Sequence, residues 1–280
     1  MSDQAAQYDH FRMLHHRSTP LLLPNPWDAG SARLFASLGF SALATTSSGY
    51  AATLGRHDGA VSRAQALTHA ADIVRATNLP VSADLENGFA RDPDRVADTV
   101  TAALDTGLAG CSIEDFTGDP DAPIYPLAEA TERVRAAAEA AHSGRVRLVL
   151  TGRAEHFLHG RPDLGEVIGR LQAYQEAGAD VLYAPGLADI SDVRSLVGSV
   201  DRPVNVLAVP GGPTVSELRG AGVARVSVGG AFAFAALGAA TQAARELLDS
   251  GTYGYLDQAA VGKEAVAVAF SGGDLADGSR

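Results

Sequence analysis

The sequence has only one cysteine, Cys111, among its 280 residues, and it has fewer basic than acidic side chains. A single cysteine excludes an internal disulfide and a metal site built from several thiolates. Because 22 Lys and Arg stand against 33 Asp and Glu, the formal net charge is −11 and no nucleic-acid partner is expected. The chain has no apolar run of roughly 18–20 residues, the length that spans a bilayer, and no apolar core of a secretory signal near its start. We therefore expect an acidic, cytoplasmic protein with no membrane partner.

The chain does contain a regular alternation of two kinds of segment. Short apolar or β-branched runs, expected as strands, lie at 20–23, 41–46, 81–84, 110–113, 146–150, 181–184, 203–208 and 225–228. Stretches with helical spacing lie at 31–38, 63–78, 94–106, 127–141, 165–177, 190–197, 215–221 and 232–248. Such alternation requires parallel strands, because each helix returns the chain to the same edge of the sheet. Eight units predict an α/β fold of the (β/α)8 TIM-barrel type; an open doubly wound sheet would favour a Gly-x-Gly-x-x-Gly motif that residues 24–30 lack.

The barrel is expected to occupy residues 20–250, after an N-terminal extension at 1–19. A further helical pattern at 256–270 defines an extra C-terminal helix within 251–270. Because this helix lies outside the eight repeating units, we expect it to pack against another subunit. Residues 271–280 are rich in Gly, Asp and Ser and are expected to form a frayed tail.

Acidic residues gather where three predicted strands end. They are Asp58, Asp84, Glu86 and Glu114. Active sites of such barrels lie at the C-terminal ends of the strands, and Asp84 and Glu86 would point to the same side of an extended chain. Carboxylates held close together repel one another unless a cation or proton lies among them, and oxygen ligands suit Mg²⁺, with Mn²⁺ as an alternative ion. The competing interpretation is that these acids cap helices or pair with Arg91 and Arg95.

Other polar residues at strand ends suit a substrate that carries a carboxylate. Arg153 follows the fifth strand and has the planar fork that matches two carboxylate oxygens, although a buried ion pair with one of the acids would explain it equally well. Ser48, Gly49 and Tyr50 follow the second strand and can present backbone N–H groups and a hydroxyl to an anion. Asn205, in the seventh strand, completes the predicted substrate-binding set.

The remaining distinctive residues are assigned structural roles. Trp27 and Asp28 are expected to be a core aromatic residue followed by a helix N-cap, and Cys111 is expected to be a small buried apolar residue. Several histidines lack ligand spacing with the acids and are expected on the surface or in structural positions: His15, His16, His142, His156 and His159.

Taken together, the motifs resemble the isocitrate lyase/phosphoenolpyruvate mutase superfamily. The matching segments are NPWDAGSA at 25–32, TSSGY at 46–50, PVSADLENGF at 80–89, IED at 113–115, TGRAE at 151–155 and VNV at 204–206. Their order, spacing and placement at strand ends agree with the family over most of the chain.

The resemblance implies a (β/α)8 barrel with the eighth helix exchanged between neighbouring subunits, and Mg²⁺ bound together with a 2-oxo acid or its enolate. It implies that Asp84 contacts the ion directly while Asp58, Glu86 and Glu114 hold its waters. It also implies that Arg153 and the backbone of Ser48, Gly49 and Tyr50 bind the substrate carboxylate. Glu86 departs from the family, which more often has Asp there, by one methylene.

A larger departure lies after the fourth strand. Lyases of the superfamily carry a Lys-Lys/Arg-Cys-Gly-His run there, whereas residues 116–126 read FTGDPDAPIYP. This segment has no Cys, Lys or His, and it also lacks the Lys, Asn and Ser of the members that transform phosphonates. The sixth strand ends in Tyr183-Ala184-Pro185-Gly186, without the Glu or His that other members use.

The sequence therefore predicts a Mg²⁺-dependent carbon–carbon lyase that acts on a short 2-oxo or 2-hydroxy dicarboxylate through an enolate. Examples are oxaloacetate decarboxylation and cleavage like that of 2-methylisocitrate lyase. Asp58, Arg153 and Tyr50 are the catalytic candidates, with Tyr50 or Tyr125 as the proton donor. A homodimer or homotetramer is expected. The alternatives are P–C bond chemistry of the phosphonopyruvate hydrolase or phosphoenolpyruvate mutase kind, and a non-catalytic 2-oxo acid binder.

Overall fold

The computed structural model describes residues 4–271 and contains one sheet of eight parallel strands. The strands are β1 (Leu21–Leu23), β2 (Leu43–Ala44), β3 (Val81–Asp84), β4 (Gly110–Glu114), β5 (Val149–Arg153), β6 (Val181–Tyr183), β7 (Val204–Leu207) and β8 (Arg225–Ser227). Their order is β1-β8-β7-β6-β5-β4-β3-β2. The two outer strands meet where the Ala44 N–H donates to the Pro24 carbonyl (3.1 Å) and the Asn25 side chain donates to the Thr45 carbonyl (2.9 Å). The predicted (β/α)8 barrel is confirmed.

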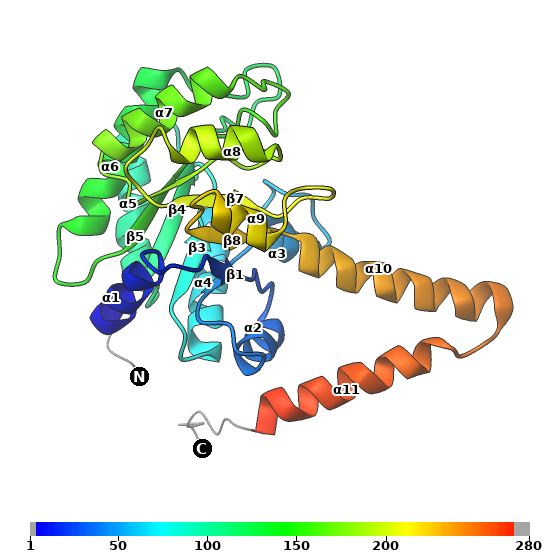
Figure 1. The fold of residues 1–280 in the computed structure, drawn as a ribbon. Helices are drawn as coiled ribbons and strands as arrows, with labels where there is room; N and C mark the ends of the chain where they lie inside the picture. Colours follow the sequence, from blue (N-terminus) through cyan, green and yellow to red (C-terminus); the bar gives the residue numbers. More distant parts are fainter. Residues whose placement is uncertain (1–3, 272–280) are drawn as a thin grey trace.

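Helices surround the strands, as Figure 1 shows. They are α1 (Gln4–Leu14), α2 (Ala29–Ser37), α3 (Ser47–Thr53), α4 (Arg63–Ala76), α5 (Pro93–Leu104), α6 (Leu127–His142), α7 (Leu164–Glu176), α8 (Ile190–Val197), α9 (Val215–Gly220), α10 (Ala231–Arg245) and α11 (Tyr255–Ser271). Within residues 4–271, none of them is both long and apolar enough to cross a membrane. The tail expected at 271–280 lies outside the described residues, apart from Ser271, which ends α11.

Local sequence explains where several helices begin and end. The Asp28 side chain accepts a hydrogen bond from the Ser31 N–H and the Ser31 hydroxyl accepts one from the Asp28 N–H, a reciprocal pair that confirms the predicted N-cap of α2. Trp27 packs against the core beside it. Gly178 follows α7 with φ of +109°, a conformation that an L side chain rarely adopts, so glycine closes this helix before β6.

The N-terminal extension is not a loose segment, because α1 closes the barrel at the N-terminal ends of the strands. Phe11 and Leu14 are fully buried there, in an apolar cluster with the first residues of several strands. A Cβ at Gly110 would lie 2.8 Å from the Phe11 ring, so glycine is needed where this ring meets β4. This helix was not predicted from the sequence.

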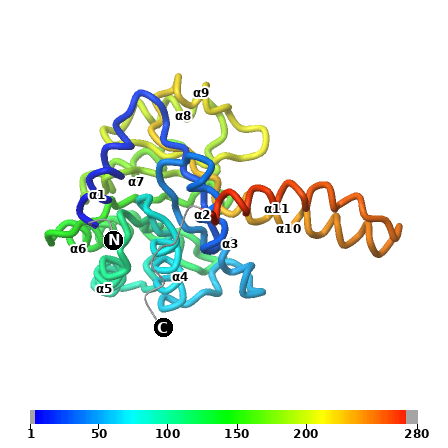
Figure 2. Tube along the Cα trace, turned by 90° about the horizontal axis from the view of Figure 1, so that it is seen from below, coloured from blue at the N-terminus to red at the C-terminus, as the bar shows by residue number. Residues whose placement is uncertain are grey.

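The chain after the barrel forms a helical arm. Helix α10 runs away from the barrel and α11 runs back toward it as a separate limb, so that α11 contacts α2 (Figures 1 and 2). The turn between them is fixed by Glu246, whose carboxylate accepts hydrogen bonds from the Thr252 hydroxyl and the Gly254 and Tyr255 N–H groups. Large apolar side chains of the arm are exposed, including Phe234 (51%) and Leu248 (83%). The predicted extra helix exists, and its exchange between subunits stays a prediction.

Candidate active site

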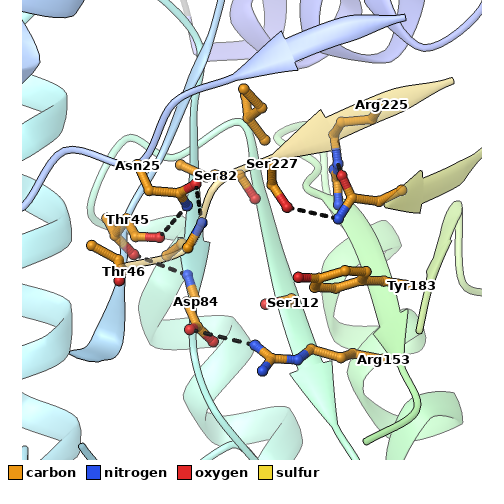
Figure 3. A pocket seen from close by; sticks show the side chains of 15 residues that line it. Asn25, Thr45, Thr46, Ser82, Asp84, Ser112, Arg153, Tyr183, Arg225 and Ser227 are labelled. Atoms are coloured by element: carbon orange, nitrogen blue, oxygen red, sulfur yellow. Dashed lines mark hydrogen bonds and ion pairs between the residues drawn. The ribbon is translucent and has the colours of Figure 1, made fainter. Parts of the chain in front are cut away.

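Three neighbouring strands bring opposite charges together at the C-terminal mouth of the barrel. Asp84 ends β3, Glu114 ends β4 and Arg153 ends β5. Arg153 Nη1 lies 3.6 Å from Asp84 Oδ2 and 3.2 Å from Glu114 Oε2, and Arg153 Nε pairs with Glu155. Figure 3 shows Arg153 facing Asp84 across the cavity. The ion pairs that were the alternative interpretation of Arg153 are therefore present. Arg91, an alternative partner for the acids, pairs with Glu129 instead.

The backbone after β3 aims two of the predicted acids. Thr45, which follows β2, accepts the Asp84 N–H at its hydroxyl oxygen (2.9 Å), and Asp84 Oδ1 accepts the Glu86 N–H (3.2 Å). Glu86 has φ of +49°, in the left-handed region, so the chain turns here. The expectation that Asp84 and Glu86 share a side of an extended strand is wrong: the turn, not strand alternation, places the Glu86 carboxylate near Asp84.

Asp58 reaches the same mouth from the loop between α3 and α4. Its Oδ1 accepts the Gly59 N–H (3.1 Å), and its carboxylate also hydrogen-bonds to Ser47 at the start of α3. Although the residue as a whole is exposed, the carboxylate is desolvated on the side facing the site. This desolvation, together with repulsion from Asp84, raises the pKa of Asp58.

The site holds more negative than positive charge. Burial, with repulsion from Asp84 and Asp58, raises the pKa of Glu86 to about 7. Burial also raises the pKa of Glu114 well above its usual range. Burial acts on Glu155 in the same direction, but Arg153 prevails and lowers the pKa of that carboxyl. One guanidinium thus faces five carboxylates.

This charge excess fits a divalent cation. All the donors are carboxylate oxygens, the ligand type that Mg²⁺ prefers. Within residues 4–271, no three His, Cys, Asp or Glu side chains converge closely enough to hold an ion directly. A site with one direct carboxylate, in which the other acids bind the ion's waters, agrees with both observations, because Mg²⁺ usually keeps several waters in proteins.

The predicted anion-binding segment after β2 is the first turn of α3. The Gly49 N–H donates to the Thr46 hydroxyl oxygen (3.2 Å), and the Tyr50 N–H donates to the Thr46 carbonyl (3.1 Å). Both amides are thus engaged by the helix, while Ser48 exchanges a hydroxyl hydrogen bond with Thr46 (3.2 Å). The Tyr50 ring stacks on His69 at 3.9 Å between centroids and lines a small cavity with Asp84 and Glu86. The roles predicted for these residues in substrate binding stay predictions.

The segment at 116–126 is a small hairpin that its own hydrogen bonds hold. Phe116 and Ile124 form an antiparallel bridge, and the Asn87 side chain donates to the Phe116 carbonyl (3.1 Å). The hairpin forms one wall of a wide cleft beside the acids. Tyr125 is 3% exposed, with its ring 4.1 Å from the Arg133 guanidinium carbon.

The sequence model of the phosphoenolpyruvate phosphomutase family matches residues 11–248. The chain belongs to this family. An uncharacterised protein of Mycobacterium tuberculosis (strain H37Rv) is 36% identical over 85% of this chain and 89% of that protein. The 2-methylisocitrate lyase of Escherichia coli (strain K12) is 30% identical over 76% of this chain and 75% of that enzyme. The oxaloacetate decarboxylase of Chromohalobacter salexigens is 30% identical over 85% of this chain and 84% of that enzyme.

Solved structures agree with this family membership. A protein of Burkholderia cenocepacia J2315, assigned as a lyase/mutase, superimposes with a TM-score of 0.90 and 48% identity, covering 94% of this chain and 95% of that one. Oxaloacetate acetylhydrolase in complex with its product oxalate superimposes with a TM-score of 0.84 and 25% identity over 95% and 94%. The chain is an enzyme of the phosphoenolpyruvate mutase/isocitrate lyase superfamily, which contains lyases and mutases.

Three residues of this phosphomutase-family site were given no role by the predictions from the sequence. Glu155 lies two residues after Arg153, and its N–H donates to Asp115 Oδ1 (2.8 Å). The signal for Glu155 in the sequence was its place in the TGRAE motif, two residues after Arg153. Tyr183, at the end of β6, lies beneath the Arg153 guanidinium, whose carbon is 5.3 Å from the ring centroid. Arg225 lies inside the barrel, and a charged residue that begins an apolar strand was the signal there.

Asn205 and Cys111 have buried positions in this family member. Asn205 is 1% exposed; its Oδ1 accepts from Arg225 Nε (2.9 Å) and its Nδ2 donates to the Ser227 hydroxyl oxygen (2.9 Å). It lines the same cavity as Asp84 and Arg153, and its predicted contact with substrate stays a prediction. Cys111 is fully buried in β4, as expected for a small apolar residue. His15 is buried as well, which confirms a structural position for it.

Proposed function

We propose that the protein is a Mg²⁺-dependent carbon–carbon lyase that acts on a short 2-oxo or 2-hydroxy dicarboxylate through an enolate. The observation that carries this proposal is the group of carboxylates around Asp84 that a single guanidinium balances only in part. The names of the relatives support it, since they include an oxaloacetate decarboxylase and a 2-methylisocitrate lyase.

Each acid has a role that follows from its position. We assign the direct contact with the ion to Asp84, and the contacts with its waters to Asp58, Glu86 and Glu114. When bound, Mg²⁺ supplies a Lewis acid for the negative charge that develops on the 2-oxo oxygen. Mn²⁺ would supply the same chemistry from the same oxygen donors.

Arg153 is suited to hold the substrate carboxylate. Its Nη1 and Nε make the shortest contacts of the ion pairs, and within the described residues 4–271 Nη2 makes no hydrogen bond to the protein. The three carboxylates around it fix the guanidinium in place, so it meets the substrate without further ordering. Asn205 and the start of α3, with Ser48 and Gly49, would line the rest of the substrate site.

Decarboxylation of oxaloacetate fits the hairpin at 116–126. In this reaction the C3–C4 bond breaks and CO₂ leaves without the electron pair of that bond. The pair stays on the remaining fragment as an enolate, which takes a proton at C3 to give pyruvate. No acid from the hairpin is required. Tyr50, which shares a cavity with Asp84 and Glu86, is the better placed of the two tyrosines to supply that proton, because the Tyr125 ring is enclosed against Arg133. A phosphonate substrate is less suited, because residues 116–126 carry no cation.

The test is pyruvate release from oxaloacetate, followed with lactate dehydrogenase and NADH against an enzyme-free sample at the same Mg²⁺ concentration. We expect a Mg²⁺-dependent rate that EDTA abolishes and added Mg²⁺ restores. Asp84→Ala should lower the rate by roughly 100-fold or more, because charge stabilisation at the reacting oxygen is lost. Glu139→Ala, which removes an exposed carboxylate of α6, should leave it unchanged.

A wild-type rate equal to the enzyme-free background would exclude oxaloacetate decarboxylation. Phosphate release from phosphonopyruvate would then support P–C bond chemistry. Calorimetric binding of 2-oxoglutarate or pyruvate, without turnover of any lyase substrate, would support a non-catalytic binder.

We also propose that the α10–α11 arm joins subunits into a homodimer or homotetramer. Its exposed apolar side chains, such as Phe234, Leu237 and Leu248, form a larger apolar surface than a free monomer normally shows. Light scattering after size exclusion should give an oligomer for the full chain and a smaller species for Leu237→Glu. A wild-type monomer would refute this assembly.

A further inference from the structure

Arg225 is a cation buried inside the barrel, one layer below the candidate active site. The residue is 4% exposed and begins β8. On β5, Thr151 contacts Arg225 while Arg153, two residues further on, contacts the acids. Because alternate residues of a barrel strand point inward, Arg225 fills the layer beneath Arg153, about 7 Å deeper along the strand.

The partners of Arg225 are all neutral. Its Nε donates to Asn205 Oδ1 (2.9 Å), its Nη2 donates to the Thr151 hydroxyl oxygen (3.1 Å), and its Nη1 lies 3.1 Å from His15 Nε2. His15 Nδ1 lies 2.8 Å from the Phe11 carbonyl, so the ring proton is on Nδ1 and Nε2 accepts from Arg225. Burial and the Arg225 charge lower the pKa of His15 to about 3, so the ring stays neutral at physiological pH.

No carboxylate balances this charge within residues 4–271, where no ion pair of Arg225 is present within 4.0 Å. Tyr183 lies near the guanidinium but is itself neutral, since burial raises its pKa to about 12. Burial lowers the pKa of Arg225 only to about 10, so the guanidinium remains charged at neutral pH. A buried charge without a counter-charge is costly, and two of the five N–H groups have no assigned partner.

The cavity beside Arg225 is continuous with the candidate active site. The same cavity of about 60 Å³ is lined by Arg225 at one end and by Asp84 and Arg153 at the other. Figure 3 shows Arg225 and Arg153 on opposite sides of the Tyr183 ring, both reaching toward this space. Its wall also carries the hydroxyl groups of Ser82 and Ser112, which are hydrogen-bond donors. The volume holds a few waters or one small anionic group.

We propose that Arg225 binds the second carboxylate of a short dicarboxylate substrate, which enters the barrel interior while the first carboxylate binds Arg153. This inference rests on the proposed function and names the feature that selects a diacid over a monoacid. It also explains why Asn205 and Thr151 hold the guanidinium in a fixed orientation, since a forked donor binds a carboxylate best when it is already ordered.

The test compares two four-carbon ligands, malate and 2-hydroxybutyrate, which differ by one carboxylate. Binding is measured by isothermal titration calorimetry with Mg²⁺ present. Wild type should bind malate more tightly than 2-hydroxybutyrate. In Arg225→Gln the ratio of the two dissociation constants should fall by about tenfold or more, because a charge-assisted hydrogen bond is removed. Retained binding of 2-hydroxybutyrate by the variant shows that it is folded. Arg225→Lys should keep part of the preference, and Arg219→Gln, which removes an exposed cation from α9, should keep all of it.

A second measurement separates this inference from the proposed function. Sodium formate should raise the melting temperature of wild type above that in sodium gluconate at equal ionic strength, because gluconate is too large for the cavity. Arg225→Gln should lose this difference. If wild type binds neither four-carbon ligand but shows the formate effect through Arg225, the proposed function fails and the anion site stands. If the malate preference and the formate effect are both unchanged in Arg225→Gln, the inference about Arg225 is wrong.

Discussion

Replacing Arg153 by alanine should destabilise the protein by an amount that depends on pH. The change leaves Asp84, Glu114 and Glu155 without the cation that they share, and removing one partner of a buried ion pair costs about 3–5 kcal/mol. For a chain of this size, this corresponds to a fall of roughly 6–20 °C in melting temperature. Arg135→Ala removes an exposed pair with Glu132 and should cost no more than about 1 kcal/mol.

The pH dependence follows from the direction of two pKa shifts. The folded pKa of Glu114 is raised, so its ionisation weakens the fold as pH rises above 4.5, and losing Arg153 increases this effect. The folded pKa of Glu155 is lowered, so its stabilising contribution is present above pH 4.5 and disappears with Arg153. The difference in free energy of unfolding between wild type and Arg153→Ala should therefore already be present near pH 5, through Glu155, and should grow toward pH 8 as Glu114 ionises without its cation.

Urea denaturation at pH 5, 6.5 and 8, with and without Mg²⁺, measures this difference. Mg²⁺ should restore part of the stability of Arg153→Ala at pH 8, because a bound cation takes over the charge; at 100 times its dissociation constant a ligand contributes about 2.7 kcal/mol. Arg153→Lys should lose less stability than Arg153→Ala, because it keeps the cation, although the ammonium lacks the planar fork of the guanidinium. A loss below about 1 kcal/mol at pH 8, or one that does not vary with pH, would refute the picture of buried carboxylates that depend on one guanidinium.

Three further predictions concern single residues. Glu86→Gly should raise the melting temperature in scanning calorimetry while lowering lyase activity, because a non-glycine residue at φ of +49° costs roughly 1–2 kcal/mol; a lower melting temperature would contradict this reasoning. Since the folded pKa of Glu86 is raised to about 7, its contribution to stability is present below pH 4.5 and is lost as pH rises toward 7; Glu86→Gln should flatten the stability profile over that interval, and an unchanged slope would count against the shift. Burial raises the pKa of Cys111 to about 12, so a thiol reagent at pH 8 should label it only after denaturation, and rapid labelling of the native protein would contradict its position in β4.

Much of the fold could be predicted because the alternation of segments is local in the sequence. The strands that carry the site, β3, β4 and β5, lie within one or a few residues of their predicted positions. Helix α1 was missed although Tyr8, Phe11 and Leu14 recur at helical spacing, because the segment lies before the first repeating unit. Helix α3 was missed because Gly49 in its first turn is typical of a loop.

The candidate site could be predicted as a set of residue types but not as a geometry. The sequence left Arg153 between a substrate clamp and a buried ion pair, since both need the same residue at the same strand end; only the distances to Asp84 and Glu114 decide that the pairs exist. The left-handed turn at Glu86 could not be foreseen, because glutamate disfavours that conformation and tertiary contacts impose it. Arg225 was missed because its importance depends on what does not pair with it, which a sequence does not reveal.

Helix α1 has a consequence for how molecules reach the barrel interior. Because Phe11 and Leu14 are fully buried in the apolar cluster at the N-terminal ends of the strands, the described residues 4–271 close the space beside Arg225 on that side. Water displaced from beside Arg225 would leave toward the mouth of the barrel, where Asp84 and Arg153 lie. A ligand would arrive from the same direction. Solvent exchange and product escape therefore share this route, and a change that narrows the mouth should slow both.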